Sequence, residues 1–163
     1  MFTEKPQVEV LSRNKERLLS LEKSGKFVFH GSPSLLPDLQ PRQSVINDKK
    51  IGNPAVYATT FAEIAIFRSL INNQGIEDNS VSTFDFDKRG LSFGASRNLL
   101  DRARGKKGLV YVLDRQKFTN FSNIECQSFE NNKPVEVIEV DFQDLPNDIE
   151  ILDPENFKTT DIP

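Results

Sequence analysis

The sequence predicts an α+β domain with mostly antiparallel sheets and with helices mainly in the N-terminal half. Short apolar segments bounded by glycine, proline or polar residues outnumber the amphipathic segments, and the two kinds do not alternate regularly along the chain. Neither a G-x-G-x-x-G nor a G-x-x-x-x-G-K-S/T sequence is present, so the fingerprints of dinucleotide-binding and P-loop domains are missing. The length of 163 residues fits a single domain.

Two helices are expected in the first half of the chain. Residues 12–24 place leucines among charged residues and end before Gly25, a residue typical of a helix C-cap. A second helix is expected at residues 61–72, because Thr60 and Glu63 have the spacing of a capping box. Its apolar face would consist of residues that recur at helical spacing, namely Ile64, Phe67 and Ile71. We expect this face to pack on a sheet.

Seven short strands are expected, each bounded by turn residues. They cover residues 26–30, 55–59, 84–87, 91–96, 109–113, 123–129 and 134–142. The segment LVYVL, residues 109–113, is a continuous apolar run and is expected to be buried on both faces. Residues 31–54 contain four prolines and show no clear periodicity. They are expected to form a long loop, and long ordered loops in compact domains often bind ligands.

Composition indicates a globular protein of the cytoplasm. Hydrophobic residues make up 37% and charged residues 28% of the chain. No uncharged apolar stretch approaches the roughly 18 residues that a membrane helix needs, and the first ten residues contain no apolar core of a signal peptide. One cysteine, Cys126, excludes an internal disulfide framework and fits a reducing compartment. We therefore expect no membrane association.

A local basic cluster contrasts with the net charge of -3, which argues against a general nucleic-acid-binding surface. Arg102, Arg104, Lys106 and Lys107 lie in the segment DRARGKKG. Such a cluster can contact the phosphates of a nucleotide or of RNA, and it is also typical of a solvated loop between two elements, which we favour. The salt dependence of RNA or DNA binding would separate the two interpretations.

The single histidine, His30, ends a predicted strand and is followed at once by Gly31 and Ser32. No G-x-S-x-G sequence accompanies it, which argues against a serine hydrolase of that type. Cys126 lies in a predicted strand without a basic neighbour to activate it, which argues against a Cys–His nucleophile. No spacing of carboxylates and histidine indicates a metal site.

Three segments occur in a characteristic order: FHGS, then VYATTFAEIAIFRSL, then a late strand that carries Glu125. In this order they resemble the His-Tyr-Glu type of the ADP-ribosyltransferase fold, the branch shared by diphtheria-toxin-like and poly(ADP-ribose)-polymerase-like enzymes. The resemblance extends over about residues 26–142 of a single domain that spans residues 1–163. It implies two small, mostly antiparallel sheets around a cleft that binds NAD as a co-substrate.

The resemblance implies a role for each residue of the trio. His30 would hydrogen-bond a ribose hydroxyl of NAD, and the adjacent Gly31 would let the backbone approach the nicotinamide amide. Tyr57 would stack on the cationic nicotinamide ring. Glu125 would be the catalytic residue: it would accept a hydrogen bond from the ribose 2′-hydroxyl and stabilise the positive charge that develops as nicotinamide leaves. It could also position or deprotonate the nucleophile.

Further contacts to NAD are expected from three residues. Ser32 belongs to the His-Gly-Ser motif, and Arg42, in the segment that follows, is a candidate for the diphosphate or adenine side. Phe67, or alternatively Phe61, would supply the second aromatic ring that many polymerase-like members carry in the helix after the motif tyrosine. Taken singly, each of these residues is compatible with a purely structural role. The ordered combination favours the functional interpretation.

Two functions follow from these expectations. The first is an NAD-dependent ADP-ribosyltransferase, a toxin-like glycosyltransferase that moves ADP-ribose to an unknown protein, nucleic-acid or small-molecule acceptor and releases nicotinamide. The second is a noncatalytic domain of similar fold that binds a nucleotide or a protein partner. An antitoxin or another regulatory partner is an expectation that the resemblance adds.

The late glutamate decides between these functions. Asn123, two residues before Glu125, is not the Gln or Glu that marks several toxin branches, so the acceptor is not carried over from the resemblance. Other glutamates compete for the catalytic place: Glu130, Glu136 and Glu139. If the Glu125 carboxylate faces the same cleft as His30 and Tyr57, the enzyme is favoured; if it faces bulk solvent, the binding module is favoured.

Overall fold

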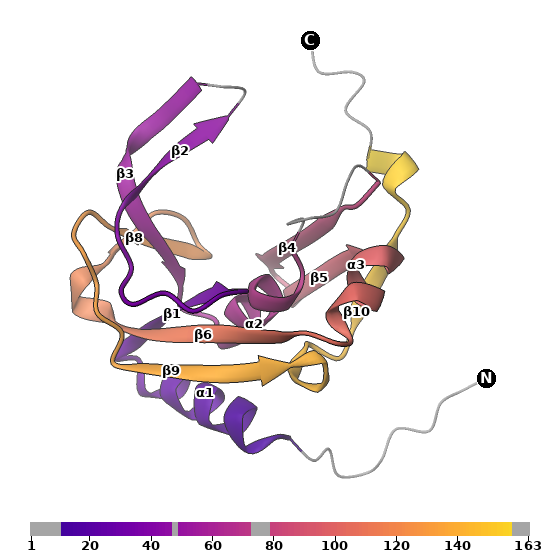
Figure 1. Cartoon of the computed structure of the whole chain (residues 1–163), viewed down its shortest axis with the longest axis horizontal. Helices are drawn as coiled ribbons and strands as arrows, with labels where there is room; N and C mark the ends of the chain where they lie inside the picture. The colour runs from indigo at the N-terminus through magenta and orange to yellow at the C-terminus, as the bar shows by residue number, and fades with distance from the viewer. Residues whose placement is uncertain (1–10, 47–48, 73–78, 158–163) are drawn as a thin grey trace.

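The computed structural model describes residues 11–46, 49–72 and 79–157. Within these ranges the protein is an α+β structure with three α-helices and two mostly antiparallel sheets (Figure 1). The helices are α1 (Arg13–Ser24), α2 (Ala62–Leu70) and α3 (Arg97–Ala103), with the 3-10 turns η1 (Arg115–Lys117), η2 (Phe142–Asp144) and η3 (Pro154–Phe157). The strands are β1 (Phe27–Ser32), β2 (Arg42–Ile46), β3 (Lys49–Thr59), β4 (Ser82–Asp87), β5 (Gly90–Ser96), β6 (Lys107–Asp114), β7 (Thr119–Asn120), β8 (Glu125–Ser128), β9 (Glu136–Asp141) and β10 (Ile149–Leu152).

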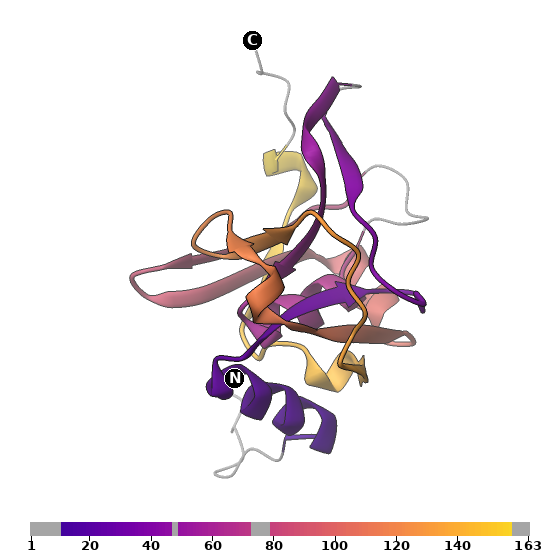
Figure 2. The same cartoon turned by 90° about the vertical axis from the view of Figure 1, so that its left-hand side faces the viewer.

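The larger sheet brings distant parts of the chain together. Its order is β7-β8-β3-β1-β6-β9, with β2 added to β3, and all its pairings are antiparallel. The outer parts of β2 and β3 form a hairpin that projects from the body of the molecule (Figure 2). The three segments of the ADP-ribosyltransferase resemblance therefore begin on neighbouring strands, because β1, β3 and β8 are consecutive in the sheet.

The smaller sheet has the order β10-β5-β4. Strands β4 and β5, both expected from the sequence, form a hairpin whose turn ends at Gly90 with a φ of 101°, a conformation that suits glycine. Strand β10 pairs with β5 in parallel. Helix α2 connects the two sheets, because it contacts β1 and β6 on one side while its Phe67 ring packs against Phe84 and Phe93 of the smaller sheet.

The two helices of the N-terminal half are confirmed, but the cap of the second differs from the prediction. Helix α1 starts after Ser12 and ends at Gly25, whose φ is 72°, as its sequence predicted. Helix α2 has Phe61 as its N-cap and no capping box from Thr60. Instead the carboxylate of Glu22 in α1 accepts a 2.7 Å hydrogen bond from the backbone N–H of Ala62. A tertiary contact thus replaces the local cap.

The buried side chains form two clusters on opposite faces of the larger sheet. The main cluster joins α1, α2, α3 and both sheets and includes Leu18, Phe29, Ile64, Phe67, Phe93, Leu99 and Val110. The second cluster lies on the other face and includes Val28, Leu39, Val56, Ala58, Tyr111, Leu113 and Cys126. Strand β6 contributes to both clusters, which confirms the predicted two-sided burial of LVYVL.

Several elements differ from the sequence prediction, and strands β7 and β10 were not among the seven that were expected. Residues 31–54 are not one long loop, since they contain β2 and the first part of β3. The β2–β3 register shifts between Arg42 and Ser44, and this irregularity accommodates Gly52 and Pro54 in the partner strand. The short helix α3 was not predicted and puts one helix in the C-terminal half. None of the helices in the described ranges is long and apolar enough to cross a membrane.

Candidate active site

The candidate site lies where β1 and β3 separate. The two strands share one registered residue pair, Phe29 opposite Thr59. Beyond this pair the imidazole of His30 bridges them, because its Nδ1 lies 2.7 Å from the carbonyl oxygen of Tyr57. On its other edge, β1 stays paired with β6 from Phe27 to Ser32. The larger sheet therefore opens at the β1–β3 seam, and His30 lies in that opening.

The hydrogen bond to Tyr57 determines which nitrogen of His30 carries the proton. A carbonyl oxygen only accepts, so Nδ1 donates and the neutral ring presents Nε2 as an acceptor. Burial lowers the pKa of His30 below its ordinary 6.5, the bond to the Tyr57 carbonyl opposes this, and the positive charges of Arg68 and Arg42 lower it further. His30 is therefore neutral at pH 7 and suited to accept a hydrogen bond from a hydroxyl group.

Tyr57 belongs to an aromatic pair, and a second aromatic pair lies at the start of α2. Its half-buried ring meets Phe121 edge-to-face, with 5.4 Å between the ring centroids and an interplanar angle of 73°. Phe121 is 56% exposed and precedes Glu125 by four residues. At the start of α2, Phe61 packs against Phe86 of β4 with a centroid distance of 4.9 Å. These rings offer apolar surface to a planar ligand.

Glu125 is the first residue of β8 and is held there by the turn before it. Its backbone N–H donates to Ser122 Oγ at 3.0 Å, and its carbonyl oxygen accepts from the N–H of Phe121 at 2.9 Å. The side-chain amide of Asn123 donates to the Phe86 carbonyl at 3.1 Å, which ties this turn to the β4–β5 hairpin. In the sheet, Glu125 stands opposite Thr59. Glu125 is therefore two residues along β8 from Gln127, the residue that stands opposite Tyr57.

The Glu125 carboxylate is ion-paired with Arg68 of α2. The Nη1 atom of Arg68 lies 3.1 Å from Oε2 of Glu125, and the two side chains are 48% and 27% exposed. The Arg68 guanidinium also lies 5.5 Å from the ring centroid of Phe84. The same arginine lines a hollow together with His30 and Tyr57. Glu125 is not part of the wall of this hollow, and Arg68 connects its carboxylate to that wall.

This hollow is small. Its volume is about 30 Å³, and its wall consists of Phe29, His30, Gly31, Tyr57, Ala58, Thr59, Ala65 and Arg68. A volume of about 30 Å³ corresponds to a single water molecule. A ring-sized ligand therefore enters only if a side chain of the wall moves. The half-exposed Arg68 is suited to such a movement, whereas Phe29 is fully buried and Gly31 is fixed by packing.

Gly31 and Ser32 have structural roles that the sequence did not reveal. A Cβ atom on Gly31 would overlap the carbonyl oxygen of Ala65, so the glycine allows α2 to pack closely on β1. The buried Ser32 hydroxyl donates to the Ser34 carbonyl at 2.9 Å and accepts from the Ser34 N–H at 3.2 Å. Ser32 therefore shapes the turn after β1 with its side chain. The contacts of both residues with NAD remain predictions.

Arg42 and Phe67 occupy different environments. Arg42 is exposed at the start of β2, opposite Ala55, and its charge acts on His30. This placement leaves it available to an anion. Phe67 is 1% exposed and packs against Phe84 and Phe93 in the core. Phe67 is therefore not placed to stack on a ligand as predicted, and Phe61 is the aromatic residue of this segment with exposed surface.

The competing glutamates lie away from the seam. Glu136 is in β9, on the far side of β6 and β1 from the seam, and pairs with Arg17 at 2.9 Å. Glu139 is an exposed residue of the same strand, and Glu130 is exposed in the loop after β8. Glu125 is therefore the late glutamate with a charged contact to the wall of the hollow.

Cys126, beside Glu125, is not an activated nucleophile. Its buried thiol donates to the Ala58 carbonyl with a sulfur–oxygen distance of 3.4 Å. Burial raises its pKa from 9.0 to about 11, so the thiol is protonated at neutral pH. Within the described parts of the chain, no group of three His, Cys, Asp or Glu side chains could hold a metal ion.

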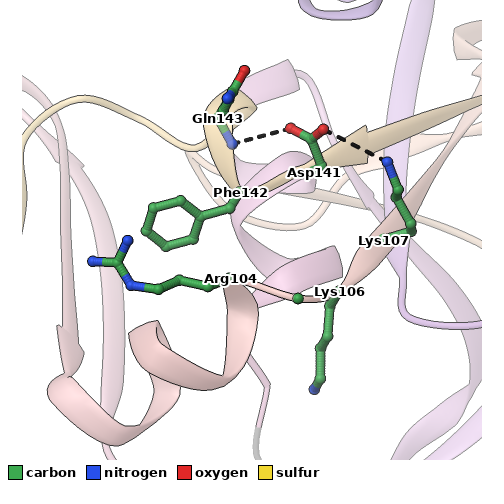
Figure 3. A pocket seen from close by; sticks show the side chains of 7 residues that line it. Arg104, Lys106, Lys107, Asp141, Phe142 and Gln143 are labelled. Atoms are coloured by element: carbon green, nitrogen blue, oxygen red, sulfur yellow. Dashed lines mark hydrogen bonds and ion pairs between the residues drawn. The ribbon is translucent and has the colours of Figure 1, made fainter.

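The basic cluster forms a separate surface hollow of about 290 Å³ between the end of α3 and η2 (Figure 3). The Arg104 guanidinium lies 4.5 Å from the centroid of the Phe142 ring and 3.8 Å from Asp101. Lys107 lies 3.7 Å from Asp141, while Lys106 points away from both (Figure 3). Carboxylates thus offset part of the charge of this cluster.

Arg68 is the residue of the site that sequence analysis missed. On an amphipathic helix, one exposed arginine among buried apolar residues is the usual solvent-facing position. Only the pairing of β8 with β3 brings Glu125 to it. Glu125 is far from α2 in sequence, so no local pattern indicated its contact with Arg68.

Comparisons with known proteins leave the geometry as the basis for interpretation. No family model matches the chain. No curated protein and no solved structure matches it either.

Proposed function

We propose that the protein is an NAD-dependent ADP-ribosyltransferase. The observation that carries the proposal is the contact between Glu125 and Arg68 at the seam of His30 and Tyr57. These residues come from β1, β3, α2 and β8, and three of them were expected as a trio from the sequence alone. A Glu125 without this contact to the wall of the hollow would have favoured the noncatalytic module.

The chemistry of the residues suits the ligand. A ring with positive charge is attracted by the face of Tyr57 and by the carboxylate of Glu125. The ribose hydroxyls find acceptors in neutral His30 and in Glu125. The negative diphosphate finds Arg42 and Arg68, whose charges both act on His30. Aromatic, acceptor and cationic groups are therefore present at one seam.

In this proposal each residue of the chain has one task. His30 orients the nicotinamide ribose through Nε2, while Tyr57 holds the ring and limits its contact with water. Glu125 accepts a hydrogen bond from the ribose 2′-hydroxyl. It also stabilises positive charge on the ribose as the bond between the anomeric carbon of the ribose and the nicotinamide nitrogen breaks. That carbon then bonds to the acceptor, which loses a proton, and nicotinamide leaves as a neutral molecule.

Calorimetric titration of NAD tests the binding part of the proposal. We expect saturable binding to the wild-type protein and a loss of at least tenfold in affinity for His30→Ala and for Tyr57→Ala. Phe129→Ala is the matched control, because Phe129 is 56% exposed and follows β8 outside the seam. Absence of heat with millimolar NAD, or equal losses in Phe129→Ala and Tyr57→Ala, would refute the proposed site.

A further inference from the structure

Arg68 occupies an unusual position in α2. It is the one exposed residue of a helix whose other residues are buried or half-buried. Its guanidinium contacts three parts of the molecule: the Phe84 ring of β4 at 5.5 Å, the Glu125 carboxylate of β8 at 3.1 Å, and the hollow at His30. The side chain therefore connects the glutamate strand to the wall of the hollow.

These contacts have two consequences for a ligand. Arg68 forms part of the wall of a hollow that holds about one water molecule. Its positive charge also pairs with the Glu125 carboxylate, which a cationic ring would need as its own partner. As long as Arg68 stays on Glu125, it remains part of the wall of this small hollow and the glutamate is engaged.

We propose that Arg68 is a latch, which closes the nicotinamide site when it is bound to Glu125 and leaves Glu125 for the diphosphate of NAD when NAD binds. This inference rests on the proposed function. It assigns to one residue both the closure of the empty site and a contact with the ligand. It also implies that Arg68 weakens the binding of the nicotinamide part of NAD and strengthens the binding of the ADP-ribose part.

The closed state is only weakly favoured. An ion pair between half-exposed side chains and an exposed cation–π contact together shift an equilibrium by about tenfold or somewhat more. A guanidinium forms two parallel hydrogen bonds with a phosphate, which is a stronger contact than its single bond to Glu125. Exchange of partners is therefore favourable once a diphosphate is present.

The position of the second arginine supports the direction of this movement. Arg42 and Arg68 both place positive charge near His30, as their combined effect on the His30 pKa indicates, although burial is the larger cause. An anion bound near His30 is attracted by both guanidinium groups. The diphosphate would thus lie on the histidine side of Arg68, away from Glu125.

Two separate titrations test the latch: nicotinamide alone and ADP-ribose alone, each into the wild type, Arg68→Ala and Arg17→Ala. Removal of the latch should strengthen nicotinamide binding by about three- to tenfold, because the site no longer has to open first. The same change should weaken ADP-ribose binding by about tenfold, because a diphosphate contact is lost. Arg68→Gln keeps an unbranched stem over Phe84. Like Arg68→Ala, it should strengthen nicotinamide binding and weaken ADP-ribose binding.

Arg17→Ala is the matched control, since it removes an exposed arginine that pairs with Glu136 at 2.9 Å on another face. It should leave both affinities unchanged. Weaker or equal nicotinamide binding in both Arg68 variants, or unchanged ADP-ribose binding, would overturn the latch while wild-type NAD binding still supports the proposed function. A wild type that binds neither NAD nor ADP-ribose would instead overturn the proposed function, and the latch with it.

Discussion

Gly31→Ala tests the packing of α2 on β1, the contact that positions both His30 and Arg68. A methyl group at this position would overlap the carbonyl oxygen of Ala65 and lie 2.9 Å from its carbonyl carbon. It would also lie 3.0 Å from the backbone nitrogen of Ser69. All three atoms belong to the backbone of α2, so no side-chain rotation relieves the overlap. The helix must move away from the strand.

The magnitude follows from the cost of overpacking. An extra methyl group in a well-packed core costs about 1–3 kcal/mol. We expect the upper half of this range, because α2 is held between β1 and the smaller sheet and cannot shift without disturbing Phe67. For a domain of this size about 1 kcal/mol lowers the melting temperature by about 2–4 °C. The expected decrease is therefore about 4–12 °C.

Urea unfolding and thermal unfolding of Gly31→Ala and Gly105→Ala provide the assay. A Cβ atom on Gly105 would have no heavy atom within 4 Å, so that variant should stay within about 0.5 kcal/mol of the wild type. The denaturant slope m should be the same for all three proteins. If Gly31→Ala is as stable as Gly105→Ala, the close contact between α2 and β1 is wrong, and with it the position of Arg68.

Three further predictions concern individual groups. Burial is the main cause that lowers the pKa of His30, so the stability that His30 contributes is present above about pH 6.5 and is lost as the pH falls toward the lowered pKa. The His30→Gln variant should therefore lose less stability than the wild type between pH 8 and pH 5. An identical pH dependence of the two proteins in urea unfolding would contradict this. Because the pKa of Cys126 is raised from 9.0 to about 11, iodoacetamide at pH 8 should alkylate the native protein about a hundredfold more slowly than the urea-unfolded chain; comparable rates would show an accessible thiolate. Glu22→Ala should lower the free energy of unfolding by about 1 kcal/mol through the lost bond from the Ala62 N–H, whereas Glu22→Gln, which keeps an acceptor oxygen, should lose less; equal losses would count against this cap.

Local signals predicted the elements whose sequence and structure agree at short range. Helix α1 has a cap at each end, at Ser12 and Gly25. The β4–β5 hairpin has alternating residues and a turn at Gly90. The LVYVL run of β6 is apolar at every position and lies in the larger sheet between β1 and β9. Each of these elements is specified by residues close together in sequence.

Other elements depend on contacts that no local pattern reveals. Strands β2 and β3 pair across an irregular register, and Gly52 and Pro54 read as a loop when considered alone. Helix α3 has seven residues, too few for a clear helical period. The cap of α2 comes from Glu22, forty residues earlier in the chain. In each case the decisive partner is supplied by the tertiary structure.

The candidate site divides in the same way. Motif order suggested His30, Tyr57 and Glu125, and the pairing of β1, β3 and β8 makes their strands neighbours. Helical periodicity could not distinguish an aromatic residue that faces the core from one that faces a ligand, so Phe67 was wrongly assigned to the site. Arg68 carried no local signal, because its partner is a strand far away in sequence.

The most direct measurement is nicotinamide release from NAD by the wild type, Glu125→Gln and the control Glu130→Gln. The account predicts steady release by the wild type and by Glu130→Gln. Glu125→Gln should release nicotinamide about a hundredfold or more slowly while it still binds NAD, because an electrostatic contact made in the transition state is lost. NAD binding without release by the wild type, or equal rates for Glu125→Gln and Glu130→Gln, would contradict the assignment of Glu125 as the catalytic residue.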